Sequence, residues 1–184
     1  MNTKLKKTIL KILKLFIQLF YKKQYLQGRY FDYSFVGFRW ALSGIFYQKI
    51  LGRNRHIPWP ITPLSTISNS KNIFFHIDDL NNFQSPGCYY QNFSAKIIIG
   101  KGTYIAPNVG IITANHDLKN LDSHSEGKDV LIGDSCWIGM SSVILPGVVL
   151  GNSTIVGAGS VVTKSFINGN CVIAGNPAKI IKMI

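Results

Sequence analysis

Residues Ile132–Ile167 read IGDSCW, IGMSSV, ILPGVV, LGNSTI, VGAGSV and VTKSFI when they are divided into sixes. An aliphatic residue opens every six, and glycine follows it in four of them. The earlier stretch Ile99–His116 continues the same phase as IGKGTY, IAPNVG and IITANH. A short period repeated this regularly indicates a solenoid, in which each repeat contacts only its neighbours.

A chain with this period is expected to wind into a three-sided coil. Each six supplies a short strand and a turn, the opening aliphatic residues stack inside, and the glycine or small residue lets the chain bend at each corner. Successive coils then pair as parallel strands about 4.8 Å apart. The sequence therefore predicts a mainly β fold, a parallel β-helix, with clear coils at 99–116, 132–149 and 150–167 and a degenerate beginning at 71–98.

Positive charge is concentrated at the start of the chain, which carries a net charge of +12. Residues 1–56 contain twelve lysines and arginines against one acid, Asp32, whereas residues 57–184 contain eight bases and seven acids. This separation fits an anionic membrane surface better than a nucleic-acid groove, so no nucleic-acid partner is predicted. The prolines in residues 57–63 cannot continue a helix. We therefore expect a helical N-terminal segment at 1–56 and a β-helix domain at 57–184, the latter ending in a cap at 168–184.

The N-terminal segment contains an amphipathic pattern at helical spacing. One narrow stripe of a helical wheel collects Lys4, Lys7, Lys11, Lys14, Gln18 and Lys22, and the opposite side collects Leu5, Ile9, Ile12, Leu13, Phe16, Leu19 and Phe20. Such a pattern is typical of a helix that lies in a membrane interface. Residues 3–23 are thus predicted to contact a membrane peripherally or, equally, to pack on the protein itself or on a neighbouring subunit. The apolar stretch Phe35–Leu51 is a second predicted helix.

The cysteines and the apolar run Thr8–Tyr21 indicate the cellular location. Cys88, Cys136 and Cys171 are far apart and form no CxxC pair, which argues against a disulfide framework and against a zinc site. The apolar run is interrupted by two lysines and is too short to span a bilayer. A cytoplasmic location is expected, with peripheral contact at the inner face of the cell membrane.

The period is interrupted once, between His116 and Ile132. The fifteen intervening residues, 117–131, are mostly polar and are predicted to form a loop extruded from the solenoid. A loop that leaves a rigid solenoid at a corner is a natural wall for a ligand cleft. His116 lies at the root of this loop and is the first candidate for chemistry.

Three motifs add a family resemblance to the repeat. The Asn115-His116-Asp117 step, the run Cys136–Gly139 and the run Ala174–Lys179 resemble those of galactoside, maltose and capsular-polysaccharide O-acetyltransferases. The resemblance covers about residues 95–184. It implies a left-handed parallel β-helix, a homotrimer with its cleft between subunits, acetyl-CoA as co-substrate, and a sugar hydroxyl of a surface polysaccharide or its precursor as acceptor.

The resemblance implies that His116 is the general base and that the deprotonated hydroxyl attacks acetyl-CoA directly. A neutral imidazole suits this role at neutral pH. Asn115 and Asp117 could fix its tautomer, as could a backbone carbonyl, and a purely structural histidine at the loop root is the alternative. Three histidines bind zinc in the γ-class carbonic anhydrases of this fold, but the spacing from His116 to His124 does not match, so no metal is predicted.

Residues expected to bind coenzyme A follow from the same resemblance: Trp137, Gly139, Met140, Ala158, Thr163, Lys164, Lys179 and Lys182. Trp137 would lie near the pantetheine arm, or be a subunit-interface aromatic. The backbone N–H of Met140 would stabilise the oxyanion. Lys179 and Lys182 would face the nucleotide phosphates, or simply be solvated.

Acceptor-binding candidates are Gln84, Ser85, Tyr90, Gln91 and Asn92. The Asn and Asp that galactoside enzymes use align with Pro86 and Ser94, so a different acceptor is inferred. Two other readings stay open: an acetyltransferase for a serine hydroxyl or a nucleotide-sugar amine, and a non-catalytic β-helix scaffold.

Overall fold

The computed structural model describes residues 3–184, with side chains from Thr8 onward. The chain divides into two compact units, Met1–Pro63 and Leu64–Ile184. The sequence places the boundary at the start of the proline-rich run, between residues 56 and 57. The division in the structure falls at the end of that run, between Pro63 and Leu64.

The first unit is helical. It contains α1 (Thr3–Ile17), the 3-10 helix η1 (Lys23–Tyr25), α2 (Val36–Gly44) and the π-helix η2 (Ile45–Ile50). Because α1 ends at Ile17, the predicted lysine stripe is shorter than expected: Gln18 and Lys22 lie beyond the helix. The side chains of Lys4, Leu5 and Lys7 lie outside the described residues.

A buried glutamine holds the first unit together. Gln48 on η2 is fully buried; its amide nitrogen donates to the Trp59 carbonyl at 3.1 Å, and its side-chain oxygen accepts from the Ile61 N–H at 3.1 Å. The Tyr21 hydroxyl lies 3.1 Å from the same oxygen. Burial raises the pKa of Tyr21, so its hydroxyl stays protonated and can donate. Segments far apart in the sequence thus meet at one side chain.

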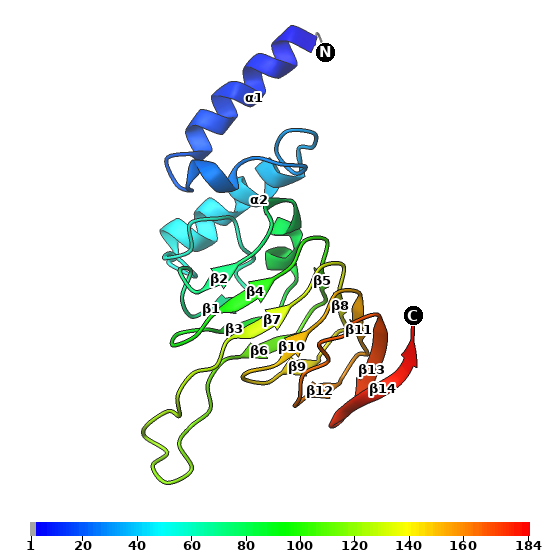
Figure 1. The fold of residues 1–184 in the computed structure, drawn as a ribbon. Coiled ribbons are helices and arrows are strands. Elements are labelled where there is room, and N and C mark those ends of the chain that lie inside the picture. Colours follow the sequence, from blue (N-terminus) through cyan, green and yellow to red (C-terminus); the bar gives the residue numbers. More distant parts are fainter. Residues whose placement is uncertain (1–2) are drawn as a thin grey trace. The chain divides into compact units, whose positions relative to one another are not determined.

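The second unit is a solenoid of short strands (Figure 1). The strands are β1 (Thr66–Ile67), β2 (Ile73–Phe74), β3 (Tyr89–Gln91), β4 (Ile97–Ile99), β5 (Tyr104–Ile105), β6 (Gly110–Ile112), β7 (Val130–Ile132), β8 (Trp137–Ile138), β9 (Val143–Ile144), β10 (Val149–Leu150), β11 (Thr154–Val156), β12 (Val161–Val162), β13 (Cys171–Gly175) and β14 (Ala178–Met183). They form three sheets, ordered β1-β3-β6-β9-β12, β10-β7-β4-β2 and β14-β13-β11-β8-β5. All pairs are parallel except β13 with β14. The prediction of a mainly β, left-handed parallel β-helix is confirmed.

The repeat explains the core of the solenoid. All nine opening aliphatic residues are at most 3% exposed: Ile99, Ile105, Ile111, Ile132, Ile138, Ile144, Leu150, Val156 and Val162. Small residues at the fifth position are buried as well, and three of them, Ser142, Thr154 and Ser160, donate a hydroxyl to a carbonyl three residues back. Ser142 Oγ bonds the Gly139 carbonyl at 2.6 Å, and Thr154 Oγ1 bonds the Gly151 carbonyl at 2.7 Å. These bonds matter because a buried hydroxyl without a partner costs about 1–3 kcal/mol.

The predicted role of the second-position glycines is wrong. The corners are turned at the fourth position, where Ser135, Ser141 and Gly147 have φ of 55°, 58° and 80°. The second-position glycines instead let neighbouring coils approach. A Cβ on Gly139 would lie 2.5 Å from the Val156 carbonyl oxygen, closer than any real side chain allows.

Both ends of the solenoid depart from the repeat. In the first coil the 3-10 helix η3 (Ile77–Gln84) takes the place of a third strand. Its Asn82 donates to the Thr103 carbonyl at 2.8 Å and accepts from the Ile105 N–H at 2.9 Å, which satisfies the free edge of β5. At the other end the antiparallel strand β14 covers β13. Covered edges protect a stack of strands from pairing with other chains.

The interruption of the repeat forms the expected loop. It runs from the end of β6 to the start of β7 and projects away from the stacked coils (Figure 1, yellow-green). It therefore leaves the solenoid at the corner between two of the three sheets.

Candidate active site

His116 lies at the root of this loop, where its imidazole is held in one tautomer. Its Nδ1 lies 2.7 Å from the carbonyl oxygen of Leu121. A carbonyl can only accept a hydrogen bond, so Nδ1 carries the hydrogen and Nε2 keeps a free lone pair. The tautomer is thus fixed by a backbone carbonyl. The contact at Nδ1 is made by the Leu121 carbonyl and by neither of the two neighbouring side-chain candidates. The Asp117 carboxylate instead accepts from the Lys119 N–H at 2.7 Å.

The loop is braced across its base by short antiparallel pairing. His116 bridges His124, and the Asp117 N–H donates to the Ser123 carbonyl at 3.0 Å. The Asn115 carbonyl accepts from both the N–H and the hydroxyl of Ser125, at 2.9 and 3.0 Å. The Leu121 carbonyl is therefore presented to His116 by a structured turn.

His124 is a residue of the site that the sequence did not single out. Its ring stacks on the His116 ring with centroids 4.4 Å apart and an angle of 31° between the planes. Its other side meets the Phe93 ring, edge to face, at 4.9 Å. A period of six says nothing about pairing within a loop, so no sequence signal identifies this contact.

A hollow of about 470 Å³ opens beside the imidazole. Its lining consists of Asn115, His116, Asp117, Leu118, Lys119 and Ser125. His116 is exposed there. A substrate hydroxyl can therefore reach the ring, which a structural histidine buried at a loop root would prevent.

Trp137 lies on β8, on the outer face of another sheet. It is 56% exposed and pairs in register with Tyr104 of β5, which is 51% exposed. Ile155 of β11 follows on the opposite side of Trp137. Two aromatic rings thus stand next to each other on this face; Tyr104 is a further residue that the sequence did not single out.

The turns that follow this sheet contain Gly139, Met140 and Ala158. They stack on one another, since the Gly159 N–H donates to the Met140 carbonyl at 2.8 Å. Met140 and Ala158 are exposed, whereas Gly139 is buried and is required there for coil packing. An amide N–H in such a turn suits the predicted oxyanion role better than a side chain would.

Thr163 and Lys164 lie on the same edge of the solenoid as His116. They follow β12, which belongs to the sheet of β6, two coils further along. Lys179 and Lys182 lie on the capping strand β14, where both are exposed.

The predicted site residues therefore sort onto two separate regions of one chain. His116, Thr163 and Lys164 follow one sheet, whereas Trp137 and Met140 belong to another sheet and its turns. A single chain does not bring the imidazole next to the tryptophan.

The structure argues against three of the five acceptor candidates. Tyr90 and Asn92 are fully buried, and their side chains donate to the Asn82 and Asn69 carbonyls at 3.2 and 2.7 Å. Gln91 is 8% exposed.

Gln91 instead supports the base of the loop that contains His116. Its amide donates to the Ala114 carbonyl at 2.9 Å, and its side-chain oxygen accepts from the Ala114 N–H at 3.0 Å, two residues before His116. Gln84 and Ser85 are half-buried, and the Ser85 hydroxyl donates to the Ile105 carbonyl at 2.7 Å.

Two of the three cysteines, Cys88 and Cys136, are not poised as nucleophiles. Burial raises the pKa of the Cys88 thiol and of the Cys136 thiol, so both are protonated at neutral pH. Within the described residues, no three His, Cys, Asp or Glu side chains gather as metal ligands.

Comparison with known proteins agrees with this fold and repeat. Residues 129–164 match the family model for the bacterial transferase hexapeptide (six repeats), so the chain carries the repeat of that family. A Dictyostelium discoideum protein named as a candidate acetyltransferase is 48% identical over 69 residues, covering 33% of this chain and 36% of that protein. The chain spans less than half the length of the curated relatives it matches.

Solved structures of similar proteins include two acyltransferases. A maltose O-acetyltransferase from Clostridium difficile is 43% identical, covers 53% of this chain and 52% of its own, and has a TM-score of 0.49. The N-acyltransferase AntD from Bacillus cereus has a TM-score of 0.51 at 19% identity, covering 67% of this chain and 79% of its own. The second likeness shows the shared fold.

Proposed function

We propose that this chain is an O-acetyltransferase that moves an acetyl group from acetyl-CoA to a sugar hydroxyl, with His116 as general base. The observation that carries the proposal is the exposed imidazole whose Nδ1 is fixed by the Leu121 carbonyl. The hexapeptide family model and the candidate acetyltransferase of D. discoideum support the reaction class.

In the proposed mechanism one proton moves from the acceptor hydroxyl to His116 and then from His116 to the departing thiolate. Nε2 of His116 takes the proton of the acceptor hydroxyl, and the oxygen attacks the thioester carbonyl directly. The Met140 N–H stabilises the oxyanion. When the C–S bond breaks, the imidazolium returns its proton to the departing thiolate. The protonated thiols of Cys88 and Cys136 fit a mechanism without a covalent enzyme intermediate.

We propose a homotrimer in which the site forms between neighbouring copies. Such an arrangement would let His116 of one copy face Trp137 of the next, since one chain holds them in different sheets. Lys179 and Lys182 would then meet the phosphates of coenzyme A. A three-sided solenoid offers flat faces that suit closed threefold packing.

The acceptor is proposed to be a sugar of a surface polysaccharide or its precursor. Phe93, 42% exposed beside His124, offers an aromatic face for the apolar side of a sugar ring. Gln84 and Ser85 remain polar candidates, and Asp117, which lines the hollow beside His116, is proposed as another. Tyr90 and Asn92 are left out because they are buried.

We propose that the second unit carries out the reaction and that residues 3–23 contact a membrane peripherally. Ile12, Phe16 and Leu19 are 63%, 47% and 77% exposed, which favours contact with a partner surface over packing on the first unit itself. Among the residues described, no helix is long and apolar enough to cross a membrane. Vesicle flotation of an Ile12→Ser, Phe16→Ser variant tests this contact, and undiminished flotation would refute it.

Release of the coenzyme A thiol in the presence of acetyl-CoA and candidate glycans tests the reaction. Wild type should release thiol only when an acceptor is present, and a His116→Ala variant should not. His76→Asn is the matched control, because it changes a histidine outside the site while an asparagine can still accept from the Asp78 N–H. No binding of acetyl-CoA by calorimetry would instead favour the scaffold reading.

A further inference from the structure

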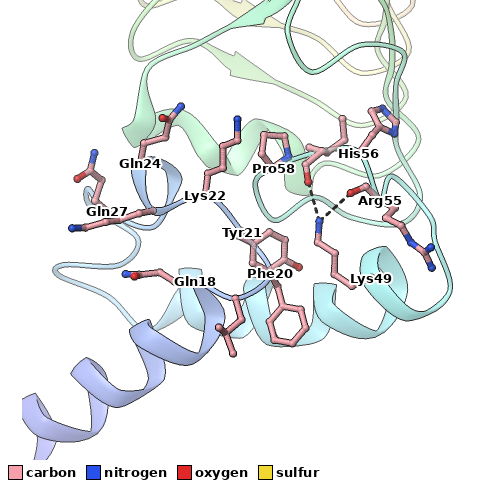
Figure 2. A pocket seen from close by; sticks show the side chains of 13 residues that line it. Gln18, Phe20, Tyr21, Lys22, Gln24, Gln27, Lys49, Arg55, His56 and Pro58 are labelled. Carbon is pink, nitrogen blue, oxygen red and sulfur yellow. Dashed lines mark hydrogen bonds between the residues drawn. The ribbon is translucent and has the colours of Figure 1, made fainter.

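The first unit contains a hollow of about 910 Å³, and the proposed reaction does not use it. Figure 2 shows the hollow and the side chains around it. All of its lining comes from residues 18–27, which follow α1 and include η1, from Lys49 of η2, and from residues 55–58. The volume is within the range of small-molecule sites.

The lining of this hollow is cationic. It includes Lys22, Lys23, Lys49 and Arg55, together with three glutamines and no carboxylate. Elsewhere in the unit a lysine does have an acidic partner, since Lys14 pairs with Asp32 at 3.1 Å. The positive charge around the hollow is therefore not neutralised by its own walls.

Lys49 is the most constrained of these cations. Its ammonium donates to the carbonyls of Arg55 and Ile57, both at 3.1 Å, and lies 4.9 Å from the centre of the Tyr21 ring (Figure 2). Burial, and secondarily the charge of Arg55, lower the pKa of Lys49. An ammonium has three N–H donors, so two carbonyls leave one for a ligand.

We propose that this hollow binds a phosphate group, presented either by a lipid headgroup or by a soluble phosphate ester. Phosphate oxygens form strong charge-assisted hydrogen bonds with ammonium groups, and a nearby anion would offset the charge on Lys49. Gln18, Gln24 and Gln27 supply amide groups that can bond hydroxyls of the remainder of the ligand. Leu19, 77% exposed, also lines the hollow and would contact apolar parts of a lipid.

This site does not depend on the proposed acetyl transfer, and it is tested without acetyl-CoA. The first experiment is calorimetry of the full chain with inorganic pyrophosphate. A Lys22→Gln, Lys23→Gln variant should lose about tenfold in affinity, as expected when charge-assisted contacts are removed. Lys49→Gln, checked for folding by circular dichroism, should bind more weakly too.

The matched control is Lys11→Gln, Arg39→Gln, which removes the same charge from the same unit but outside the hollow. It should keep wild-type affinity for pyrophosphate. No binding by the wild-type chain, or an equal loss in the two double variants, would overturn the proposal, because general charge attraction would then explain the result.

The second experiment separates the two sources of phosphate. Phosphatidylcholine vesicles with and without phosphatidic acid are floated with the full chain, and pyrophosphate is added as competitor. Displacement by pyrophosphate from the phosphatidic acid vesicles, absent in the Lys22→Gln, Lys23→Gln variant, would identify a lipid headgroup. Binding of pyrophosphate without any displacement would identify a soluble phosphate ester.

Discussion

The two units of this chain satisfy their buried polar groups in different ways. In the solenoid, Ser142 and Ser160 each bond a carbonyl three residues back, and the side chains of Asn82 and Gln91 bond backbone groups of the next coil. In the first unit, Gln48 joins segments more than ten residues away in sequence. Buried polar contacts are thus spread over several side chains and coils in the solenoid, whereas among the described residues of the first unit they are gathered at one side chain.

The largest effect is expected from His116, the proposed general base, which ends the last six before the period is interrupted. His116→Ala should lower kcat by about 10²–10⁴-fold, the usual range for a general base. Thermal unfolding should hardly change, because the ring is exposed. Thiol release in steady state measures the first quantity and calorimetric melting the second. Turnover within a few-fold of wild type would remove His116 from the mechanism.

The next largest effect is expected from Gln48→Ala, which tests whether the first unit depends on the buried contacts of this one side chain. It should destabilise that unit by about 3 kcal/mol, because the Trp59 carbonyl and the Ile61 N–H lose their buried partner. Urea unfolding followed by tryptophan fluorescence reports on it, since Trp40 and Trp59 belong to this unit. Gln27→Ala, at an exposed position, should stay within about 0.5 kcal/mol of wild type.

Gly139→Ala probes the stacking of coils in the solenoid. The added methyl would meet the Val156 carbonyl oxygen at 2.5 Å and the Ala158 nitrogen at 2.7 Å, so a loss of about 2 kcal/mol is expected. Gly110→Ala is the control, because its methyl would lie 3.7 Å from the Val143 side chain, an ordinary contact. Equal losses in the two variants, measured by urea unfolding, would contradict the packing explanation.

How much of each unit could be predicted from the sequence depends on whether its buried contacts follow the repeat. The period of six predicted every buried opening aliphatic, because each depends only on neighbouring repeats. It also located His116, at the point where the period stops. In the first unit, α2 and η2 lie within the predicted helix Phe35–Leu51, but no pattern in the sequence identifies the contacts that Gln48 makes across the unit.

Two of the acceptor candidates, Tyr90 and Asn92, are buried for a related reason. Tyr90 and Asn92 lie in the coil before His116, but their side chains point into internal contacts that no period reveals. His124 was missed because pairing inside a loop depends on geometry that the sequence pattern does not show. Leu121 was missed because it contributes a backbone carbonyl, which every residue type has.

The smallest effect is expected from substitutions of His124, which test the ring contact inside the loop. Its ring makes no hydrogen bond to the His116 ring but stacks on it, so it acts as a positioning residue. His124→Ala should lower kcat by about three- to tenfold while leaving the pH dependence of kcat in place, since the base itself is unchanged. His124→Phe keeps an aromatic ring between Phe93 and His116 and should restore most of the rate. If His124→Phe is as slow as His124→Ala, stacking is not what His124 contributes, and an imidazole proton acceptor at this position would then have to be considered alongside His116.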